Sequence, residues 1–163
     1  MAGETRPGDP ERMDVNEREA YILAGLRRIV DHAYHHAPAV RRQFDRVGVR
    51  PEDIGAVCDL ERIPVTKKDD LLQLQRADPP FGGFLAVPLE ELSRIYVSPG
   101  FIYDPQGIAE SKRMDRAFAA AGVGKGDRVL NTWSYHMVPA GLLIDEATRK
   151  TAGRPAPYDM TTY

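Results

Sequence analysis

The spacing of apolar residues changes near the middle of this 163-residue sequence. In the first half they recur every three or four residues, most clearly from Tyr21 to Ala33, as on one face of a helix. The second half predicts, in order, a strand over 93–97, a loop over 98–107, a helix over 108–121, a strand over 128–132 and a helix over 138–147. We therefore expect an α/β protein whose helical N-terminal half is followed by the beginning of a parallel sheet.

The two ends of the chain depart from this pattern. Residues 1–14 are polar and interrupted by glycine and proline, so we expect a flexible arm. Residues 148–163 show no strand pattern, and we interpret them as an atypical tail after a single-domain portion over 15–147. Because a parallel sheet needs further elements to cover both faces, we expect this sheet to be incomplete.

Composition excludes several classes of function. Lys and Arg number 22 against 24 Asp and Glu, so the net charge of −2 predicts neither a nucleic-acid partner nor an anionic membrane surface. No apolar run reaches the roughly 20 residues of a membrane span, and the N-terminus does not resemble a secretory signal. The single cysteine, Cys58, cannot form an internal disulfide. These features predict a cytoplasmic protein.

The loop over 98–107 is a candidate phosphate-binding loop because backbone N–H groups between a strand and a helix can cradle an anion. Its candidate contacts are Ser98, Gly100, Tyr103 and Gly107. Two prolines in the loop lack N–H donors, and the nearest lysine after it is Lys112. An ordinary strand-to-helix connection is therefore the alternative interpretation.

The segment 131–141 follows the second predicted strand, and ligands of open α/β sheets bind beyond the carboxyl ends of strands. Large side chains next to a glycine would suit a pocket for a flat organic acid. The candidate substrate contacts are Trp133, Tyr135, His136 and Gly141. In the alternative interpretation, Trp133 and Met137 belong to the hydrophobic core.

We assign no metal ligand and no catalytic residue. His32, His35 and His36 have a spacing that can bind a metal on one helix face, but no further ligand accompanies them, and the helix dipole also favours histidines near a C-terminus. Ser134 and His136 lie too close along the chain to form a Ser-His-acid set. Cys58 has no neighbouring cations to acidify it.

Several segments together resemble a known family. They are Ala33-Tyr-His-His-Ala-Pro38, Ile63-Pro-Val-Thr-Lys-Lys-Asp-Asp-Leu71, Pro80-Phe-Gly-Gly-Phe84, Arg94-Ile-Tyr-Val-Ser98 and Ala120-Ala-Gly-Val-Gly-Lys-Gly-Asp-Arg-Val129. In this order they resemble the N-terminal part of the phenylacetate–coenzyme A ligases, which are members of the adenylate-forming (AMP-dependent synthetase) superfamily. The resemblance covers residues 20–147.

The resemblance implies a reaction in which Mg-ATP activates an aryl or related carboxylic acid to an acyl adenylate and the acyl group passes to coenzyme A. It places the 98–107 loop at the family's phosphate loop, approximately Ser-Ser-Gly-Thr-Thr-Gly-Lys-Pro. Ser98 and Gly100 match this pattern, whereas Phe101 and Ile102 replace the two threonines. It also aligns Tyr135, His136 and Gly141 with a region that helps to line the acyl pocket.

Two functions follow as hypotheses. In the first, the chain is a truncated phenylacetate–coenzyme A ligase-like protein that is inactive alone, with ATP, Mg and coenzyme A as cofactors by resemblance and a carboxylic acid as ligand. In the second, it is a non-catalytic module with an altered phosphate loop that binds a small molecule or self-associates into a homo-oligomer, with no cofactor expected in this chain. This hypothesis rests on the apolar residues Phe101-Ile102-Tyr103 and on an unpaired edge of the incomplete sheet, which is a template for another strand. The sequence leaves open whether the chain is an enzyme.

Overall fold

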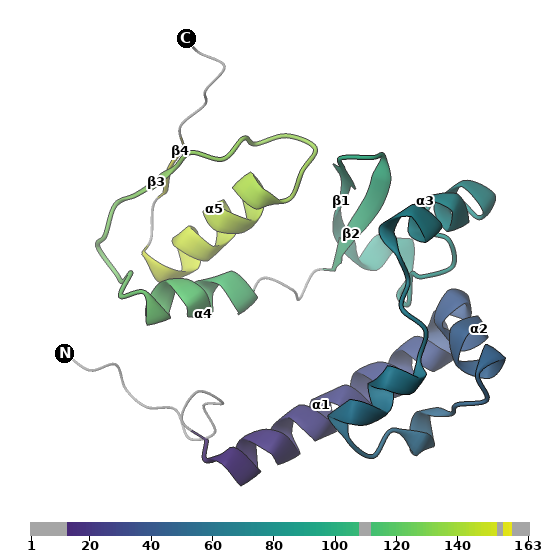
Figure 1. Cartoon of the computed structure of the whole chain (residues 1–163). Helices are drawn as coiled ribbons and strands as arrows, with labels where there is room; N and C mark the ends of the chain where they lie inside the picture. The colour runs from purple at the N-terminus through teal and green to yellow at the C-terminus, as the bar shows by residue number, and fades with distance from the viewer. Residues whose placement is uncertain (1–12, 108–111, 153–154, 158–163) are drawn as a thin grey trace. The chain divides into compact units, whose positions relative to one another are not determined.

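The computed structural model describes residues 13–107, 112–152 and 155–157 (Figure 1). The chain divides into two compact units, one within Met1–Lys67 and Gly82–Ala86, the other within Lys68–Phe81 and Val87–Tyr163. The arm expected over residues 1–14 lies outside the described residues except for Met13 and Asp14.

The first unit is helical, as the apolar spacing predicts. Its elements are α1 (Val15–His36), α2 (Pro38–Arg46) and two short 3-10 helices, η1 (Pro51–Asp53) and η2 (Val57–Arg62). Helix α1 begins with a capping box, because the Asp14 carboxylate accepts from the Glu17 backbone N–H at 2.9 Å and the Glu17 carboxylate accepts from the Asp14 N–H at 3.2 Å. Pro38 separates α1 from α2 by starting the second helix.

The core of the first unit lies where α1 and α2 meet the segment that follows them. Its buried members are Val30, Tyr34, Phe44, Val49 and Ile54. The Tyr34 hydroxyl donates to the Asp45 carboxylate at 2.8 Å, and the Arg50 guanidinium donates to the same oxygen at 2.8 Å. The polar edge of this core is therefore hydrogen-bonded rather than left unpaired.

Asp59 closes the first turn of η2. Its carboxylate accepts the backbone N–H groups of Ala56 and Gly55, each at 2.8 Å. These two hydrogen bonds, first that of Ala56 and then that of Gly55, lower the pKa of Asp59 below its ordinary value.

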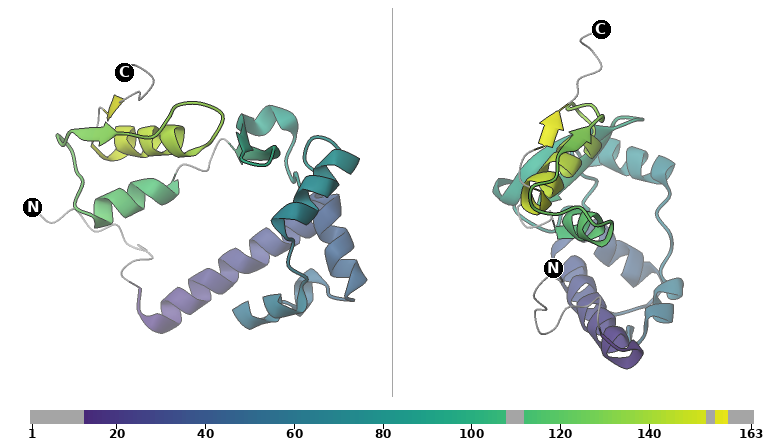
Figure 2. Two further views of the ribbon diagram at one scale, coloured as in Figure 1. Left: turned by 45° about the horizontal axis from the view of Figure 1, so that its top comes forward. Right: turned by 90° about the vertical axis from the view of Figure 1, so that its left-hand side faces the viewer.

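The second unit mixes helices with two small sheets. Its elements are α3 (Lys68–Ala77), η3 (Leu89–Glu91), β1 (Leu92–Ser98), β2 (Ile102–Gly107), α4 (Lys112–Ala120), β3 (Val129–Asn131), α5 (Ala140–Thr151) and β4 (Pro155–Pro157). Strands β1 and β2 are antiparallel, and β3 and β4 are parallel. Both views of Figure 2 show α4 and α5 side by side.

The expected α/β class is confirmed, but the predicted strand–loop–helix order after residue 93 is wrong. Residues 98–107 do not form one loop, because residues 102–107 form β2 and pair back onto β1. Gly100 and Phe101, with φ of 99° and 61°, turn the chain back within a few residues. The helix predicted over 108–121 is observed as α4, and residues 108–111 lie outside the described residues.

The tail also differs from the expectation that it holds no strand. Helix α5 runs on to Thr151, and β4 then pairs with β3 through Pro155, Ala156 and Pro157. The sequence pattern did not predict this strand because Pro155 and Pro157 lack backbone donors, and proline in sheets is confined to edge positions. No helix in the described ranges is both long enough and apolar enough to cross a bilayer.

Helix α5 begins where the loop over 132–139 passes against it. A β-carbon built on Gly141 would lie 2.2 Å from the backbone oxygen of Ser134 and 3.2 Å from that of Trp133. Only glycine therefore allows this close approach.

We expect Gly141→Ala to lower the free energy of unfolding by roughly 2 kcal/mol, because backbone atoms rather than a mobile side chain must move. Gly124→Ala is the matched control, since a β-carbon there meets nothing within 4 Å. Urea unfolding of both variants checks this expectation, and equal stabilities would contradict it.

Phe101 carries left-handed backbone strain that glycine would relieve. Its φ is 61° and its side chain is 79% exposed, so little packing is lost on truncation. Phe101→Gly should raise the free energy of unfolding by about 1 kcal/mol. Phe101→Ala keeps the β-carbon and should give no such gain. A gain of the same size in both variants, measured by urea unfolding, would show that strain is not the cause.

Acid should weaken the first unit through Asp59. Because its folded-state pKa is lowered, Asp59 contributes stability that is present above its unfolded pKa, near 3.8, and is lost as the pH falls through the folded value. Asp59→Asn should therefore be less stable than wild type at neutral pH and should flatten the loss of stability below pH ~4. Thermal unfolding across the acid range tests this; identical pH profiles would exclude the assigned role.

Candidate functional site

The turn between β1 and β2 presents the first group of candidate residues. Ser98 ends β1, and the Phe101 N–H donates to the Ser98 carbonyl at 3.0 Å. Among the described residues, the Ser98 hydroxyl has one hydrogen bond, a long one of 3.4 Å to the Ile102 carbonyl. Ile102 is buried and Phe101 is exposed, so the two apolar residues of the turn point to different surroundings.

The structure separates the four residues proposed for phosphate binding. Ser98 and Gly100 lie together at the turn. Tyr103 lies one residue into β2 and pairs with Val97, whereas Gly107 pairs with Leu92 at the far end of the hairpin. A single small anion at the turn could therefore contact Ser98 and Gly100 but not Gly107.

Lys68 brings to this turn the positive charge that the loop itself lacks. A β-carbon built on Gly100 would lie 4.0 Å from Cε of Lys68, so the lysine side chain passes directly beside the glycine. Lys68 is the first residue of α3, well before the hairpin in the chain. Lys68 is not among the residues proposed from sequence, because the nearest lysine to the loop along the chain is Lys112. The feature that could have pointed to Lys68 is the Thr-Lys-Lys-Asp-Asp-Leu segment, to which no chemical role was assigned.

The second group of candidates surrounds Asn131, which is 2% exposed at the end of β3. Its side-chain amide donates to the Tyr135 hydroxyl and to the Gly141 carbonyl, both at 2.9 Å, and its side-chain oxygen accepts the Trp133 N–H at 3.1 Å. One buried amide thus fixes three of the four candidate residues. Asn131 itself was not among the candidates.

Tyr135 extends this network to α5. Its hydroxyl donates to the Asp145 carboxylate at 3.2 Å, and Arg149 donates to the same carboxylate at 2.6 Å. The pKa of Tyr135 is raised, mainly by burial of the hydroxyl, while the Asn131 hydrogen bond opposes the shift. The hydroxyl therefore acts as a neutral hydrogen-bonding group that holds the loop.

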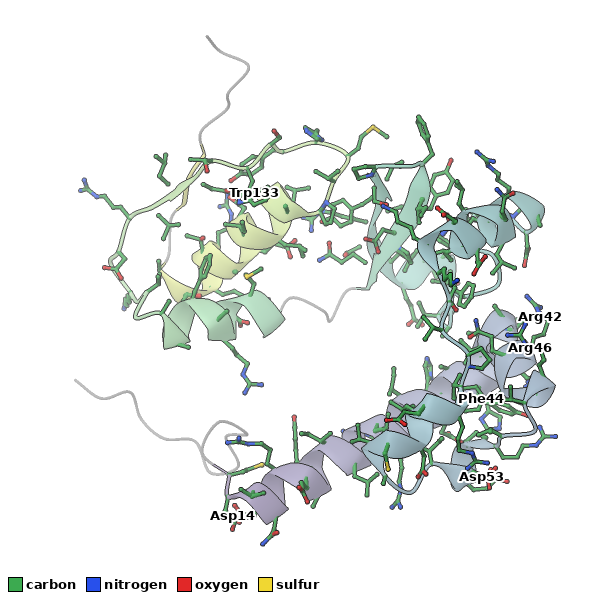
Figure 3. The ribbon with its side chains drawn as sticks, viewed as in Figure 1. Asp14, Arg42, Phe44, Arg46, Asp53 and Trp133 are labelled. Atoms are coloured by element: carbon green, nitrogen blue, oxygen red, sulfur yellow. The ribbon has the colours of Figure 1, made fainter. Side chains whose placement is uncertain are left out.

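Trp133 and His136 differ from Tyr135 in exposure and contacts. Trp133, which is labelled in Figure 3, is 57% exposed, and Met137 is 61% exposed, so the alternative that they are core residues does not hold in this structure. His136 is exposed and makes no hydrogen bond or ion pair within the described part of the chain. The loop over 132–139 thus presents apolar side chains to solvent from a fixed backbone.

The two groups of candidates are neighbours. The Val97 N–H donates to the Met137 carbonyl at 2.8 Å, one residue before Ser98. Glu146 on α5 also accepts from Arg94 of β1 and, at 3.3 Å, from the side-chain amide of Gln106 of β2. The hairpin turn and the aromatic loop are therefore held on one framework.

The three histidines of α1 do not form a metal centre. The rings of His32 and His36 lie 4.6 Å apart, whereas Nδ1 of His35 lies 2.8 Å from the Asp31 carbonyl. Among the described residues, no group of three or more His, Cys, Asp or Glu side chains is placed to hold a metal.

In sequence, the chain is similar to phenylacetate-coenzyme A ligases from several bacteria. The chain is 33% identical over 143 residues to the phenylacetate-coenzyme A ligase of Escherichia coli (strain K12), covering 82% of this chain and 32% of that protein. It is 35% identical over 147 residues to the phenylacetate-coenzyme A ligase of Aromatoleum evansii, covering 83% of this chain and 32% of that protein. No family model matches the chain.

The fold agrees with the sequence comparison. The crystal structure of 2-hydroxyisobutyryl-CoA ligase in complex with 2-HIB-AMP matches with a TM-score of 0.80 and 27% identity, covering 96% of this chain and 35% of that one. The chain thus spans about a third of the length of the relatives it matches. By sequence and by fold the chain is similar to one part, about a third, of the adenylate-forming phenylacetate–coenzyme A ligases, and the matches are consistent with their N-terminal part.

Proposed function

We propose that this chain supplies the polyphosphate-binding turn and one wall of the carboxylic-acid pocket of an adenylate-forming acid–coenzyme A ligase. The observation that carries the proposal is the position of Lys68 beside Gly100 at the β1–β2 turn. An ammonium group beside a glycine turn is suited to phosphate oxygens, because a charged donor hydrogen-bonds to them about twice as strongly as a neutral one.

The residues at the β1–β2 turn are suited to a polyphosphate. They offer fewer hydroxyl groups than the Ser/Thr-rich loop of the family. The Ser98 hydroxyl makes only a 3.4 Å hydrogen bond within the turn, so it can rotate toward an anion. Lys68 supplies charge where Phe101 and Ile102 have replaced threonines. Bound ATP would supply the phosphoanhydride whose cleavage activates a carboxylic acid. Mg²⁺ and coenzyme A enter the proposal only through the family, with no described residue assigned to either.

The loop over 132–139 forms the proposed acid-binding wall. Trp133 and Met137 are more than half exposed, and the Asn131 amide fixes the backbone from which they project. Large apolar side chains on a rigid backbone suit the hydrocarbon part of a carboxylic acid. Because the chain covers about a third of its relatives, we propose that turnover needs groups beyond those that it supplies.

Self-association by strand addition, the alternative function, finds less support in the hairpin. On the outer edge of β2, the backbone groups of Tyr103 are already bonded to a side chain, and Pro105 has no N–H. On the outer edge of β1, the Val97 N–H is taken by the Met137 carbonyl. An edge with few free donors is a poor template for another strand.

Replacing Lys68 tests the proposed site. Lys68→Met should weaken the binding of inorganic pyrophosphate about tenfold, which corresponds to about 1.4 kcal/mol. Lys67→Met removes the same charge from the preceding, exposed residue and should change the affinity less than twofold. Isothermal titration at fixed ionic strength measures both. Equal losses would mean that only overall charge matters, and unchanged binding in Lys68→Met would remove the lysine from the site.

A further inference from the structure

Gln75 is a buried polar side chain that joins α3 to β2. It is 6% exposed, and both ends of its amide are used. The amide nitrogen donates to the Tyr103 carbonyl at 2.8 Å, and the amide oxygen accepts the Tyr103 N–H at 2.9 Å. This pair of hydrogen bonds reproduces the pattern that a neighbouring strand would offer.

The amide bonds to the outer edge of the hairpin. Tyr103 stands opposite Val97, whose own N–H points away from β2 to the Met137 carbonyl. The pair is therefore a non-hydrogen-bonded one, and the Tyr103 backbone groups face outward, where Gln75 meets them. Gln75 thus binds the side of β2 that β1 does not use.

The same helix carries Lys68 to the turn. Lys68 and Gln75 are seven residues apart in α3, so they lie on one helix face about 10 Å apart along its axis. Their partners are Gly100, which lies in the β1–β2 turn, and Tyr103, which lies in β2. Helix α3 therefore meets the hairpin at two places, the turn through Lys68 and strand β2 through Gln75.

We propose that Gln75 is a positioning residue that sets the register of α3 on the hairpin and thereby holds the Lys68 ammonium at the β1–β2 turn. This inference rests on the proposed polyphosphate site for its functional meaning. The positioning role itself needs no ligand. Without the two hydrogen bonds between the Gln75 amide and the Tyr103 backbone, α3 loses this directional contact to β2. Helix α3 then no longer keeps Lys68 beside Gly100.

The test compares Gln75→Met with Gln73→Met. Gln73 lies on the same helix but is exposed and makes no hydrogen bond within the described residues, so it is the matched control. The readout in the full chain is the nuclear Overhauser effect between the Lys68 Hε and Gly100 Hα protons. We expect it in wild type and in Gln73→Met, and expect it to vanish in Gln75→Met while the amides of α3 stay protected from hydrogen exchange.

Gln75→Glu provides a second variant if Gln75→Met does not fold. A protonated carboxyl has a donor and an acceptor, as the amide does, whereas a carboxylate cannot donate to the Tyr103 carbonyl. The Lys68–Gly100 effect should therefore be weak at pH 7 and recover as the introduced carboxylate is protonated at lower pH. A general loss of stability would not reverse in this direction.

Pyrophosphate affinity links the inference to the proposed function. We expect Gln75→Met to weaken binding about fivefold in the wild-type background and not at all in a Lys68→Met background, because Gln75 acts through Lys68. If Gln75→Met keeps both the Lys68–Gly100 effect and the wild-type affinity, the inference is overturned. If wild type does not bind pyrophosphate yet the effect still depends on Gln75, the proposed function fails and the positioning role stands.

Discussion

A two-stranded hairpin has two outer edges, and the fold of the second unit depends on the hydrogen bonds that the backbone groups at both edges make. An isolated hairpin is marginal in water, since many of its backbone groups lack partners within it. Here the Gln75 amide bonds to one edge at Tyr103, and the Met137 carbonyl accepts from the other at Val97. Through these contacts β1 and β2 are anchored to α3 on one side and to the loop before α5 on the other.

This anchoring explains why residues far apart in sequence meet at one place. Helix α3 brings Lys68 to the turn, and the loop brings Met137 to within one residue of Ser98. Buried amides direct both elements, Gln75 in the first case and Asn131 in the second. A buried amide whose nitrogen and oxygen are both hydrogen-bonded favours one arrangement, because a shifted register would leave these polar atoms unpaired.

Much of the helical part could be predicted from sequence. The apolar spacing of α1 follows from a face that packs on Phe44 and Ile54, and Pro38 marks the next helix. The hairpin could not be predicted from apolar spacing, because Pro105 weakens the strand pattern of β2. The hydrogen bonds at the outer edge of β2 come from Gln75, which lies far away in sequence. Strand β4 was missed for a similar reason, since two of its three residues are proline.

The site was predictable in its parts but not in its assembly. Residues 98–100 and the aromatic loop stand out in sequence, and the family resemblance gives them an order. Lys68 and Asn131 do not stand out, because a lysine at a helix start and an asparagine after a strand are ordinary at those places. Their importance comes from what they touch, which only the folded chain shows.

Amide-resolved mapping of ATP binding on the ¹⁵N-labelled chain tests the central claim most directly. Saturable shifts centred on the backbone of Ser98, Gly100 and Phe101, with smaller ones at the start of α3, are the predicted result. Shifts that avoid the β1–β2 turn and gather elsewhere, or no saturable shifts at all, would contradict the assignment of this turn as a polyphosphate site.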